Sequence, residues 1–138
     1  GDLNWNRIVP DTIKSLFYHK SPIIRSDGTC IRDYIFIEDA SDGYMKLAEN
    51  THREGIKGEA FNFSTGERLT VLDMVKKITQ LFPSNLEPTI LNQVQGEIKH
   101  QYLSNEKSKA LLNWKPKHTI DQSLAKTITW YKSFLQNS

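Results

Sequence analysis

Apolar residues recur at helical spacing in several stretches of the chain. The clearest period runs from Val71 to Phe82, and a second long stripe consists of Ile120, Leu124, Ile128, Tyr131 and Leu135. Shorter periodic stretches cover residues 7–19, 40–50 and 105–112. Residues suited to capping precede each helix: Asn6, Asp39, Thr70, Ser104 and Thr119, with capping boxes expected at Thr70 and Thr119. The pattern therefore predicts four or five helices.

Short apolar stretches between these helices predict strands. They cover residues 23–25, 31–37, 60–63, 88–91 and 100–103. Residues 31–37 carry apolar side chains on both faces, which suits a buried strand. All are too short for an obvious independent sheet. The pattern predicts one helix-rich, mixed α/β domain over residues 1–138, in which some strand edges pair with a part of a longer protein.

Composition narrows the functional classes. The chain has 138 residues and a net charge of +2, and its 18 Lys and Arg residues are scattered, so we expect no nucleic-acid partner. No apolar run approaches the ~20 residues of a membrane-spanning helix. Cys30 is the single cysteine, which fits a reducing cytosol, and we expect a cytoplasmic protein. The start, without Met or signal peptide, indicates that the chain begins inside a longer protein.

Several kinds of chemistry lack the residues they require. The four histidines, His19, His52, His100 and His118, lie far apart without a second ligand at metal-binding spacing, so no metal site is expected. Cys30 has no adjacent base and is expected to be a small buried residue. The chain contains neither a GxGxxG fingerprint nor a P-loop. We therefore expect no catalytic residue and no cofactor site within it.

Arg32 is the strongest candidate for a binding residue. It stands in an apolar stretch, where a cation is costly unless it meets an anion. The guanidinium is a rigid fork of donors that suits carboxylate or phosphate oxygens. The anion is either an internal carboxylate, with Asp33, Glu38 and Asp39 close in sequence, or a ligand. The residues alone leave both interpretations open.

Three further residues are candidates for the same region. Arg7 opens the first helix and Arg25 ends the strand before Arg32, so both could converge on it. Asn62 lies inside an apolar strand, where its amide could contact a ligand or satisfy backbone groups. For both arginines, solvated or internal roles are the competing interpretation.

Motifs along the whole chain resemble the extended short-chain dehydrogenase/reductase family, in the branch of nucleotide-sugar 4,6-dehydratases and 4-epimerases. The matching stretches keep the family's order: residues 1–2, 7–10 (RIVP), 25–29 (RSDGT), 31–39 (IRDYIFIED), 61–64 (FNFS), 69–71 (LTV), 96–98 (GEI), 109–116 (KALLNWKP) and 127–131 (TITWY). The resemblance covers only the C-terminal half of such an enzyme. It implies the nucleotide-sugar-binding portion, without a complete Rossmann sheet.

The resemblance also implies site residues. In this family an N-terminal Rossmann domain binds NAD(P), and the C-terminal part binds the nucleotide sugar. Arg32 matches an arginine that binds the diphosphate, and Asn62 matches a position near the base or diphosphate. The helix start at Arg7, Val9 and Pro10 matches one that lies against the nucleotide. Many relatives carry Arg-Pro-Gly where this chain has Gln95-Gly96, with Lys99 further on, so the chain departs from the family at the second phosphate contact.

The implied function is the substrate-binding part of an NAD-dependent nucleotide-sugar 4,6-dehydratase, a lyase. Gln101-Tyr102-Leu103 and the RSDGT turn are most similar to CDP-glucose 4,6-dehydratases. The alternatives are a 4-epimerase of the same family or a non-catalytic binding module. The partner would be a CDP-, UDP-, dTDP- or GDP-hexose. Because the glycine-rich fingerprint and the Tyr-x-x-x-Lys pair are missing, we expect the chain to be inactive alone. Because the strands near Arg32 and Phe61 would normally pack on the Rossmann domain, we expect their apolar surface to be uncovered and the chain to self-associate.

Overall fold

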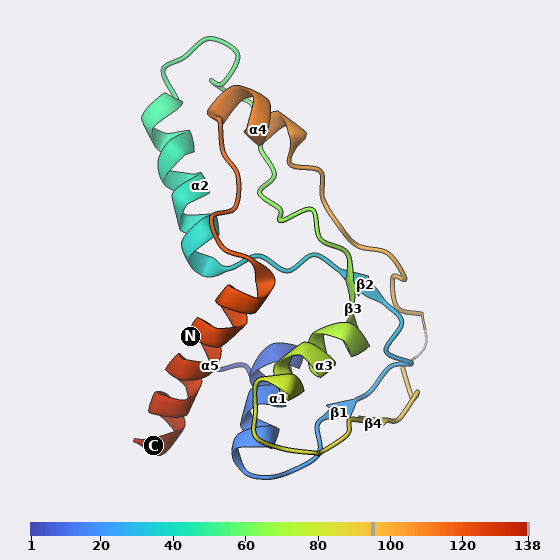
Figure 1. Cartoon of the computed structure of the whole chain (residues 1–138). Coiled ribbons are helices and arrows are strands. Elements are labelled where there is room, and N and C mark those ends of the chain that lie inside the picture. Colours follow the sequence, from blue (N-terminus) through green and yellow to red (C-terminus); the bar gives the residue numbers. More distant parts are fainter. Residues whose placement is uncertain (95, 138) are drawn as a thin grey trace.

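The computed structural model describes residues 1–94 and 96–137, which form five helices and four two-residue strands. In chain order these are α1 (Ile8–Phe17), β1 (Ile23–Ile24), β2 (Ile31–Arg32), α2 (Ile37–Asn50), β3 (Leu69–Thr70), α3 (Val71–Gln80), β4 (Thr89–Ile90), α4 (Glu106–Leu112) and α5 (Ile120–Gln136). This confirms the predicted mixed, helix-rich α/β class. Figure 1 shows α1, α3, α5 and all strands in one body, from which α2 and α4 project.

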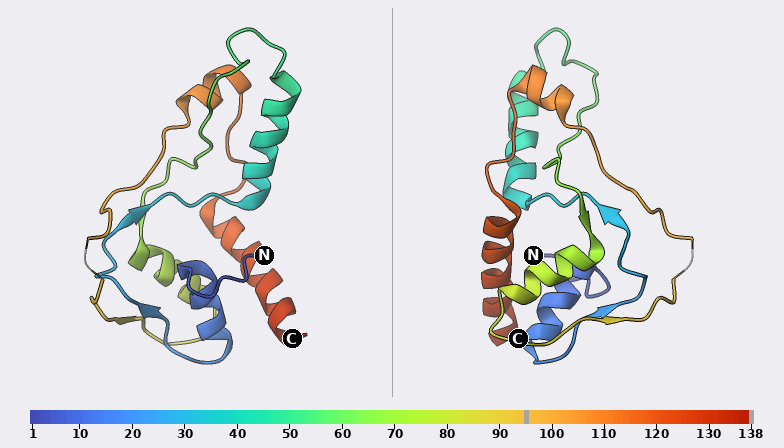
Figure 2. Two further views of the ribbon diagram at one scale, coloured as in Figure 1. Left: turned by 180° about the vertical axis from the view of Figure 1, so that it is seen from behind. Right: turned by 45° about the vertical axis from the view of Figure 1, so that its right-hand side comes forward.

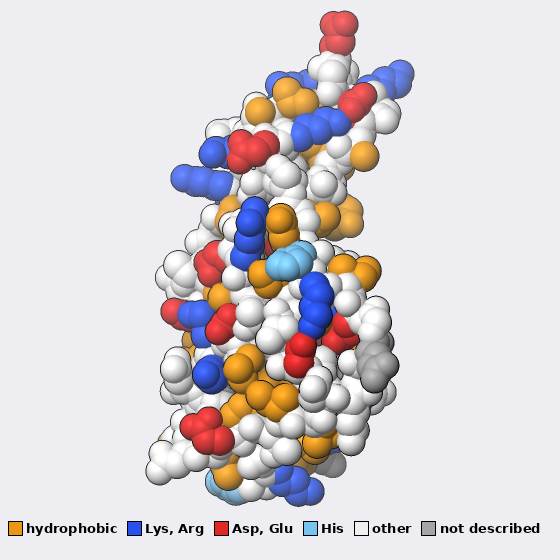
Figure 3. All heavy atoms as spheres, turned by 90° about the vertical axis from the view of Figure 1, so that its right-hand side faces the viewer, with side chains coloured by type: hydrophobic (Ala, Val, Ile, Leu, Met, Phe, Trp, Pro, Cys, Tyr) orange, Lys and Arg blue, Asp and Glu red, His pale blue; other side chains and the backbone are white. Residues whose placement is uncertain are grey.

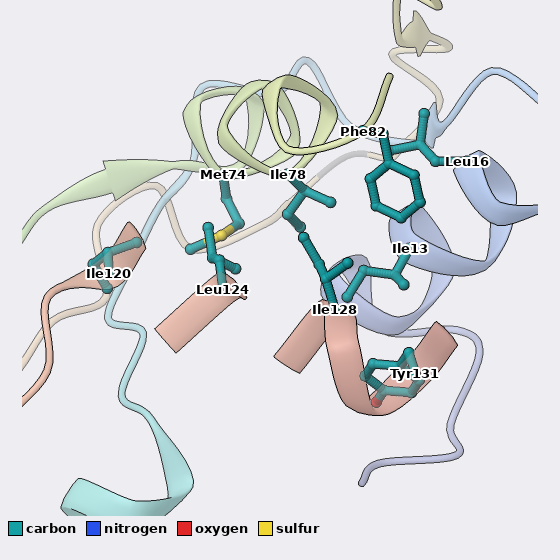
Figure 4. Packing of buried hydrophobic residues seen from close by; sticks show 9 residues of the cluster. All are labelled: Ile13, Leu16, Met74, Ile78, Phe82, Ile120, Leu124, Ile128 and Tyr131. Carbon is teal, nitrogen blue, oxygen red and sulfur yellow. The ribbon is translucent and has the colours of Figure 1, made fainter. Parts of the chain in front are cut away.

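The main core lies between α1, α3 and α5. Met74 and Ile78 of α3 face Leu124 and Ile128 of α5, and Ile13 of α1 points into the same space (Figure 4). The predicted α5 stripe is buried along its whole length. Two capping boxes fix the starts of α3 and α5, because the Thr70 and Thr119 side chains accept from the N3 backbone and the N3 side chains bind back.

Two small strand pairs connect the helices on one side of this core (Figures 1 and 2). Strand β1 pairs in parallel with β4, and β2 pairs antiparallel with β3, with Arg32 opposite Leu69. A single bridge joins Ile31 to His100. Segments 27–32 and 97–101 thereby lie side by side, which positions Arg32.

A second, smaller cluster lies in the α2–α4 lobe, which we define as residues 37–63 and 105–114. Its buried members are Ile56, Leu112 and Trp114, with Phe61 and Phe63 packed against them. The Phe63 and Trp114 ring centroids are 5.0 Å apart. Figure 2 shows the lobe extending from one end of the main body in both views.

Three predicted helix caps are wrong. Helix α1 begins at Ile8 with Arg7 as N-cap, and the Asn6 backbone N–H instead donates to the Asn4 side chain. Helix α2 begins at Ile37, so Asp39 lies inside its first turn, where distant backbone groups occupy its carboxylate. Helix α4 is capped by Asn105, one residue after the predicted Ser104. Long-range contacts thus engage the Asp39 side chain, whereas the contact at Asn6 is local.

Three of the five predicted strands, at residues 23–25, 31–37 and 88–91, were correct in position and too long, whereas residues 60–63 and 100–103 form no strand apart from a single bridge at His100. Of residues 31–37 only Ile31–Arg32 pair as a strand, and Ile37 already belongs to α2. Residues 60–63 form no ladder with any described segment. Asn113 is the C-cap of α4 and adopts a left-handed conformation, with φ 48°. Within the described residues, every helix is too short or too polar to cross a bilayer.

Candidate functional site

A groove with a volume of about 1220 Å³ lies between the start of the chain, the first turn of α1, residues 34–38 and one face of α5. Three of the predicted site residues, Arg7, Val9 and Pro10, line it. Its walls are largely apolar and include Ile8, Val9, Ile35, Phe36, Ile37 and Trp130. The family resemblance predicts that the start of α1 lies at the nucleotide-binding site, and in the structure this turn lines the groove.

The charged side chains of the groove are paired within the chain. The Arg7 Nη1 atom donates to Asp2 Oδ2 at 3.0 Å. The Lys126 Nζ atom donates to Glu38 Oε2 at 2.7 Å. Opposite charges therefore offset each other at the rim.

Tyr34 also lines the groove. Its hydroxyl is buried, and no hydrogen-bond partner exists for it among the described residues. Burial raises the pKa of Tyr34 to about 12, although the nearby Arg32 charge acts in the opposite direction. The phenol is therefore a neutral hydroxyl with unused hydrogen-bonding capacity.

Arg32 lies apart from the groove lining, at the end of β2. Its Nη1 atom donates to the backbone carbonyls of Ile31 at 2.9 Å and Ile98 at 2.7 Å, and its Nη2 atom donates to Glu97 Oε1 at 3.2 Å. The Arg32 side chain is 23% exposed and that of Glu97 is 34% exposed. An internal ion pair thus exists, and its carboxylate belongs to Glu97.

The three carboxylates near Arg32 in sequence have other partners. Asp33 Oδ2 accepts from the Leu103 backbone N–H at 3.0 Å. Glu38 pairs with Lys126, and Asp39 binds Lys117 and His118. Closeness in sequence did not identify the ion-pair partner of Arg32, because residues 33–39 leave β2 and lead into α2.

Residues 96–99 lie against the turn that precedes β2 and contact it through Lys99. Lys99 Nζ donates to Asp27 Oδ2 at 2.6 Å, and this hydrogen bond holds the pKa of the Asp27 carboxyl below its usual range. The Lys99 carbonyl accepts from the Ile31 backbone N–H at 2.8 Å. Lys99, a candidate second cation, is therefore paired internally. Gln95 lies outside the described residues.

The other two predicted residues lie elsewhere. Arg25 is exposed and lies near Asp11, whose pKa is raised by burial and lowered to a lesser degree by the Arg25 charge. Asn62 is exposed, and its backbone carbonyl accepts from the Ser108 hydroxyl in the α2–α4 lobe. Among the described residues, no hydrogen bond or ion pair joins any two of the six predicted site residues, so their joint role stays a prediction.

Sequence reasoning missed Glu97, Tyr34 and Arg68. The Arg68 guanidinium lies 4.0 Å from the centre of the Tyr102 ring, directly before β3, whose Leu69 pairs with Arg32. Glu97 is 65 positions from Arg32, so no local spacing reveals the pair. An acidic residue directly after a glycine turn in an exposed loop was the one available signal.

The face bearing β1 and β4 carries mixed charge. In Figure 3, Lys and Arg side chains lie beside Asp and Glu side chains, and the apolar groups are small and separate. That face shows no stripe of one sign, of the kind nucleic-acid binding requires. Among residues 1–94 and 96–137, no three His, Cys, Asp or Glu side chains cluster so as to bind a metal ion.

Known proteins with similar sequences are UDP-glucose 4-epimerases. The chain is 32% identical over 105 residues to one from Cyamopsis tetragonoloba, covering 76% of this chain and 30% of that protein. It is 30% identical over 117 residues to one from Drosophila melanogaster, covering 84% of this chain and 33% of that protein. The chain thus spans about a third of the length of these relatives. No family model matches it.

Solved structures show the same fold. The UDP-glucose 4-epimerase of Thermotoga maritima, solved with UDP-glucose, superimposes with a TM-score of 0.83 at 25% identity, over 94% of this chain and 40% of that one. A Bacillus anthracis dTDP-glucose 4,6-dehydratase superimposes with a TM-score of 0.74 at 23% identity, over 94% and 40%, and shares the fold.

Fold and sequence together define the class as the extended short-chain dehydrogenases/reductases, and the chain fits a C-terminal portion of such a protein. Within that class its homologues are nucleotide-sugar 4-epimerases, with a 4,6-dehydratase among the structural neighbours. The family predicted from the sequence motifs is confirmed. The comparisons give no specific support to the 4,6-dehydratase over the 4-epimerase.

Proposed function

We propose that the chain is the nucleotide-sugar-binding portion of a longer, NAD-dependent enzyme that acts at C4 of a hexose. Relatives named as UDP-glucose 4-epimerases favour epimerisation and a UDP-sugar. The similarity of Gln101-Tyr102-Leu103 to 4,6-dehydratases favours the second candidate, elimination of water after oxidation at C4. Product analysis of the complete enzyme separates them, since one returns the C4 epimer and the other a 4-keto-6-deoxy sugar.

The observation that carries this proposal is the fixed orientation of Arg32. A guanidinium has five N–H donors, and contacts with the described residues use three of them. The donors on Nε and one on Nη2 have no partner in the described part of the chain. Because Glu97 and the Ile98 carbonyl fix the group and part of it is exposed, it is pre-organised for a phosphate oxygen. Arg68, one strand away, is a second cation near the same place.

The chain supplies no residue for hydride or proton transfer in this proposal. It contains no glycine-rich dinucleotide fingerprint, and no tyrosine has a lysine four positions later. NAD, when bound, supplies the redox chemistry and would be held by the part of the enzyme outside this chain. The role of these residues is to bind and orient the nucleotide sugar.

Calorimetric titration tests the proposal with UDP-, CDP-, dTDP- and GDP-hexoses. We expect weak, selective binding, because many ligand contacts would lie outside the chain. Arg32→Ala should weaken it at least about tenfold, since a charge-assisted hydrogen bond contributes about 1.5–3 kcal/mol. Arg32→Lys should recover it only in part, because an ammonium cannot replace the planar fork.

Arg53→Ala is the matched control. This variant also removes one positive charge, but Arg53 binds Asn50 and the Leu111 carbonyl in the α2–α4 lobe. Binding should not change in this variant. If Arg32→Ala unfolds the chain, or if no nucleotide sugar binds the folded protein, the internal ion pair is the whole role of Arg32 and the proposal fails.

Self-association of the isolated chain is part of the proposal. Ile37, Tyr44 and Met45 on α2 are 70%, 69% and 62% exposed, which is unusual for such side chains on one helix. Light scattering should show a mass that rises with concentration. A clean monomer at high concentration would contradict this expectation.

A further inference from the structure

Strand β2 is the middle one of three extended segments, which we call the Arg32 strip: β3, β2 and residues 97–102 (Figure 1). On one side β3 pairs with β2, with Arg32 opposite Leu69. On the other side the Ile31 backbone N–H donates to the Lys99 carbonyl at 2.8 Å, and the Gln101 N–H donates to the Ile31 carbonyl at 3.1 Å. Few backbone hydrogen bonds therefore hold the two outer segments to β2.

The register places three side chains in one row across the Arg32 strip. Continuing the β2–β3 pairing by one residue brings Arg68 opposite Asp33. Continuing the parallel bridge at His100 by two residues brings Tyr102 beside Asp33 from the other side. Because side chains alternate between the two faces of extended backbone, this row points to the face opposite to that of Arg32.

Arg68 and Tyr102 meet across this row. The Arg68 guanidinium lies 4.0 Å from the centre of the Tyr102 ring, which is a cation–π contact, and we call this contact the Arg68–Tyr102 clasp. Asp33, in the middle of the row, accepts from the Leu103 backbone N–H through Oδ2 at 3.0 Å. Cross-strand side-chain contacts stabilise sheets measurably, and short strands depend on them most. The clasp thus joins the two outer segments of the strip.

One of the segments joined by the clasp carries the groups that fix Arg32. The Arg32 Nη2 atom donates to Glu97 Oε1 at 3.2 Å, and its Nη1 atom donates to the Ile98 carbonyl at 2.7 Å. Both acceptors lie in the same extended segment as Tyr102. A movement of this segment away from β2 would take the two acceptors with it, and the guanidinium would lose its fixed orientation.

We propose that Arg68 and Tyr102 are positioning residues for Arg32. Their clasp on one face of the strip holds residues 97–102 against β2 and thereby keeps the Arg32 guanidinium oriented on the other face. This inference rests on the proposed function, in which the oriented guanidinium binds a phosphate of the nucleotide sugar. Arg68 acts through the strands, because its charge is directed to the Tyr102 ring and not to the ligand.

Calorimetric titration with UDP-glucose tests the clasp. Arg68→Met and Tyr102→Leu each remove it, and each should weaken binding about two- to fivefold, the range expected for an exposed cation–π contact. The double variant should bind no more weakly than either single variant, because the two changes remove one contact. Tyr102→Phe is the matched control, since it keeps the ring and should bind as the native chain does. Both side chains are exposed, so the variants should stay folded, which circular dichroism checks.

The Arg32 Nε–H signal in ¹H–¹⁵N spectra gives a second measurement, which needs no ligand. With the clasp intact the guanidinium holds one orientation, and the signal should be sharp. It should broaden in Arg68→Met and in Tyr102→Leu, and it should stay as in the native chain in Tyr102→Phe. Arg32→Lys identifies the signal by its absence.

The outcomes separate the clasp from its alternatives. Weaker binding in Arg68→Met alone makes Arg68 a direct ligand contact and overturns the proposal, and so do additive losses in the double variant. An unchanged Arg32 signal in both single variants also overturns it. If no nucleotide sugar binds, or if Arg32→Ala leaves binding intact, the proposed function fails, while the Arg32 signal still decides whether the clasp orients this side chain.

Discussion

Asp39 and His118 lie 79 positions apart, and the Asp39 Oδ1 atom is 2.9 Å from the His118 Nδ1 atom. The same carboxylate accepts from the backbone N–H groups of Lys117 at 3.0 Å and His118 at 3.3 Å. Asp39 is 1% exposed. One buried carboxylate in the first turn of α2 therefore fixes the segment that enters α5, and with it the edge of the groove at Glu38 and Lys126.

Asp39→Asn should lower the free energy of unfolding by about 1.5–3 kcal/mol, because an amide has one acceptor oxygen and no charge to offer to these donors. Urea denaturation at pH 7 measures the change. Asp42→Asn is the control, with the same substitution on the same helix. Asp42 binds the exposed Lys117 ammonium, and its loss should cost less than about 1 kcal/mol. Equal losses in the two variants would contradict the role given to Asp39.

The pH dependence of stability should report the same carboxylate. Burial acts to raise the pKa of Asp39, but hydrogen bonds from the His118 ring and from the two backbone N–H groups outweigh it and hold this pKa below 3.8. A lowered folded-state pKa means that the unfolded chain binds the proton more tightly. The contribution of Asp39 to the free energy of unfolding is therefore complete above pH 3.8 and is lost as the pH falls through the folded-state pKa.

Urea denaturation of the native chain and of Asp39→Asn across that range tests the sign. The difference between their unfolding free energies should be constant from pH 7 to about pH 5 and should shrink on further acidification. A difference that grows toward low pH would show that folding raises the pKa of Asp39 and does not lower it.

Local chemistry was enough to predict most of the helices. The structure confirms the capping boxes at Thr70 and Thr119 and the α5 stripe, which are set by residues close together in sequence. The predicted N-caps at Asn6 and Asp39 were wrong. Asp39 has the residue type of a cap, but His118 and its neighbours, which no local pattern connects to it, engage its side chain.

The candidate site was less predictable for the same reason. That Arg32 needs an anion follows from its apolar surroundings in sequence, and the structure provides one. Its identity does not follow, because a long-range contact between β2 and residues 97–101, which includes the bridge between Ile31 and His100, brings Glu97 to Arg32. The groove combines the chain start with α5, and no periodicity encodes that contact.

The α2–α4 lobe should unfold locally without the main core. Trp114 is 0% exposed, contacts Phe63 and donates from Nε1 to the Asp39 carbonyl at 3.3 Å. Trp114→Phe should weaken this small cluster, since it removes the hydrogen bond and part of the ring. Amide hydrogen exchange should accelerate in α2 and α4 and stay unchanged in α3, whose core residues Met74 and Ile78 belong to the other cluster. Uniform acceleration in all three helices would instead show a single cooperative unit.

Gly43 should resist replacement by alanine even though it lies inside a helix. By intrinsic propensity, Gly→Ala in a helix interior gains about 1 kcal/mol. At this position, however, an added Cβ would lie 2.6 Å from the Cδ1 atom of Phe63, a ring that is packed against Trp114. Forcing the ring aside costs about 1–3 kcal/mol, so the packing penalty should prevail and the thermal midpoint should fall.

Ser41→Ala, on the exposed face of the same helix, should raise the midpoint slightly. Phe63→Leu should cost less in the Gly43→Ala background than in the native chain, because the smaller side chain relieves the overlap. Circular dichroism melts of the four variants measure this coupling, and additive effects would refute it.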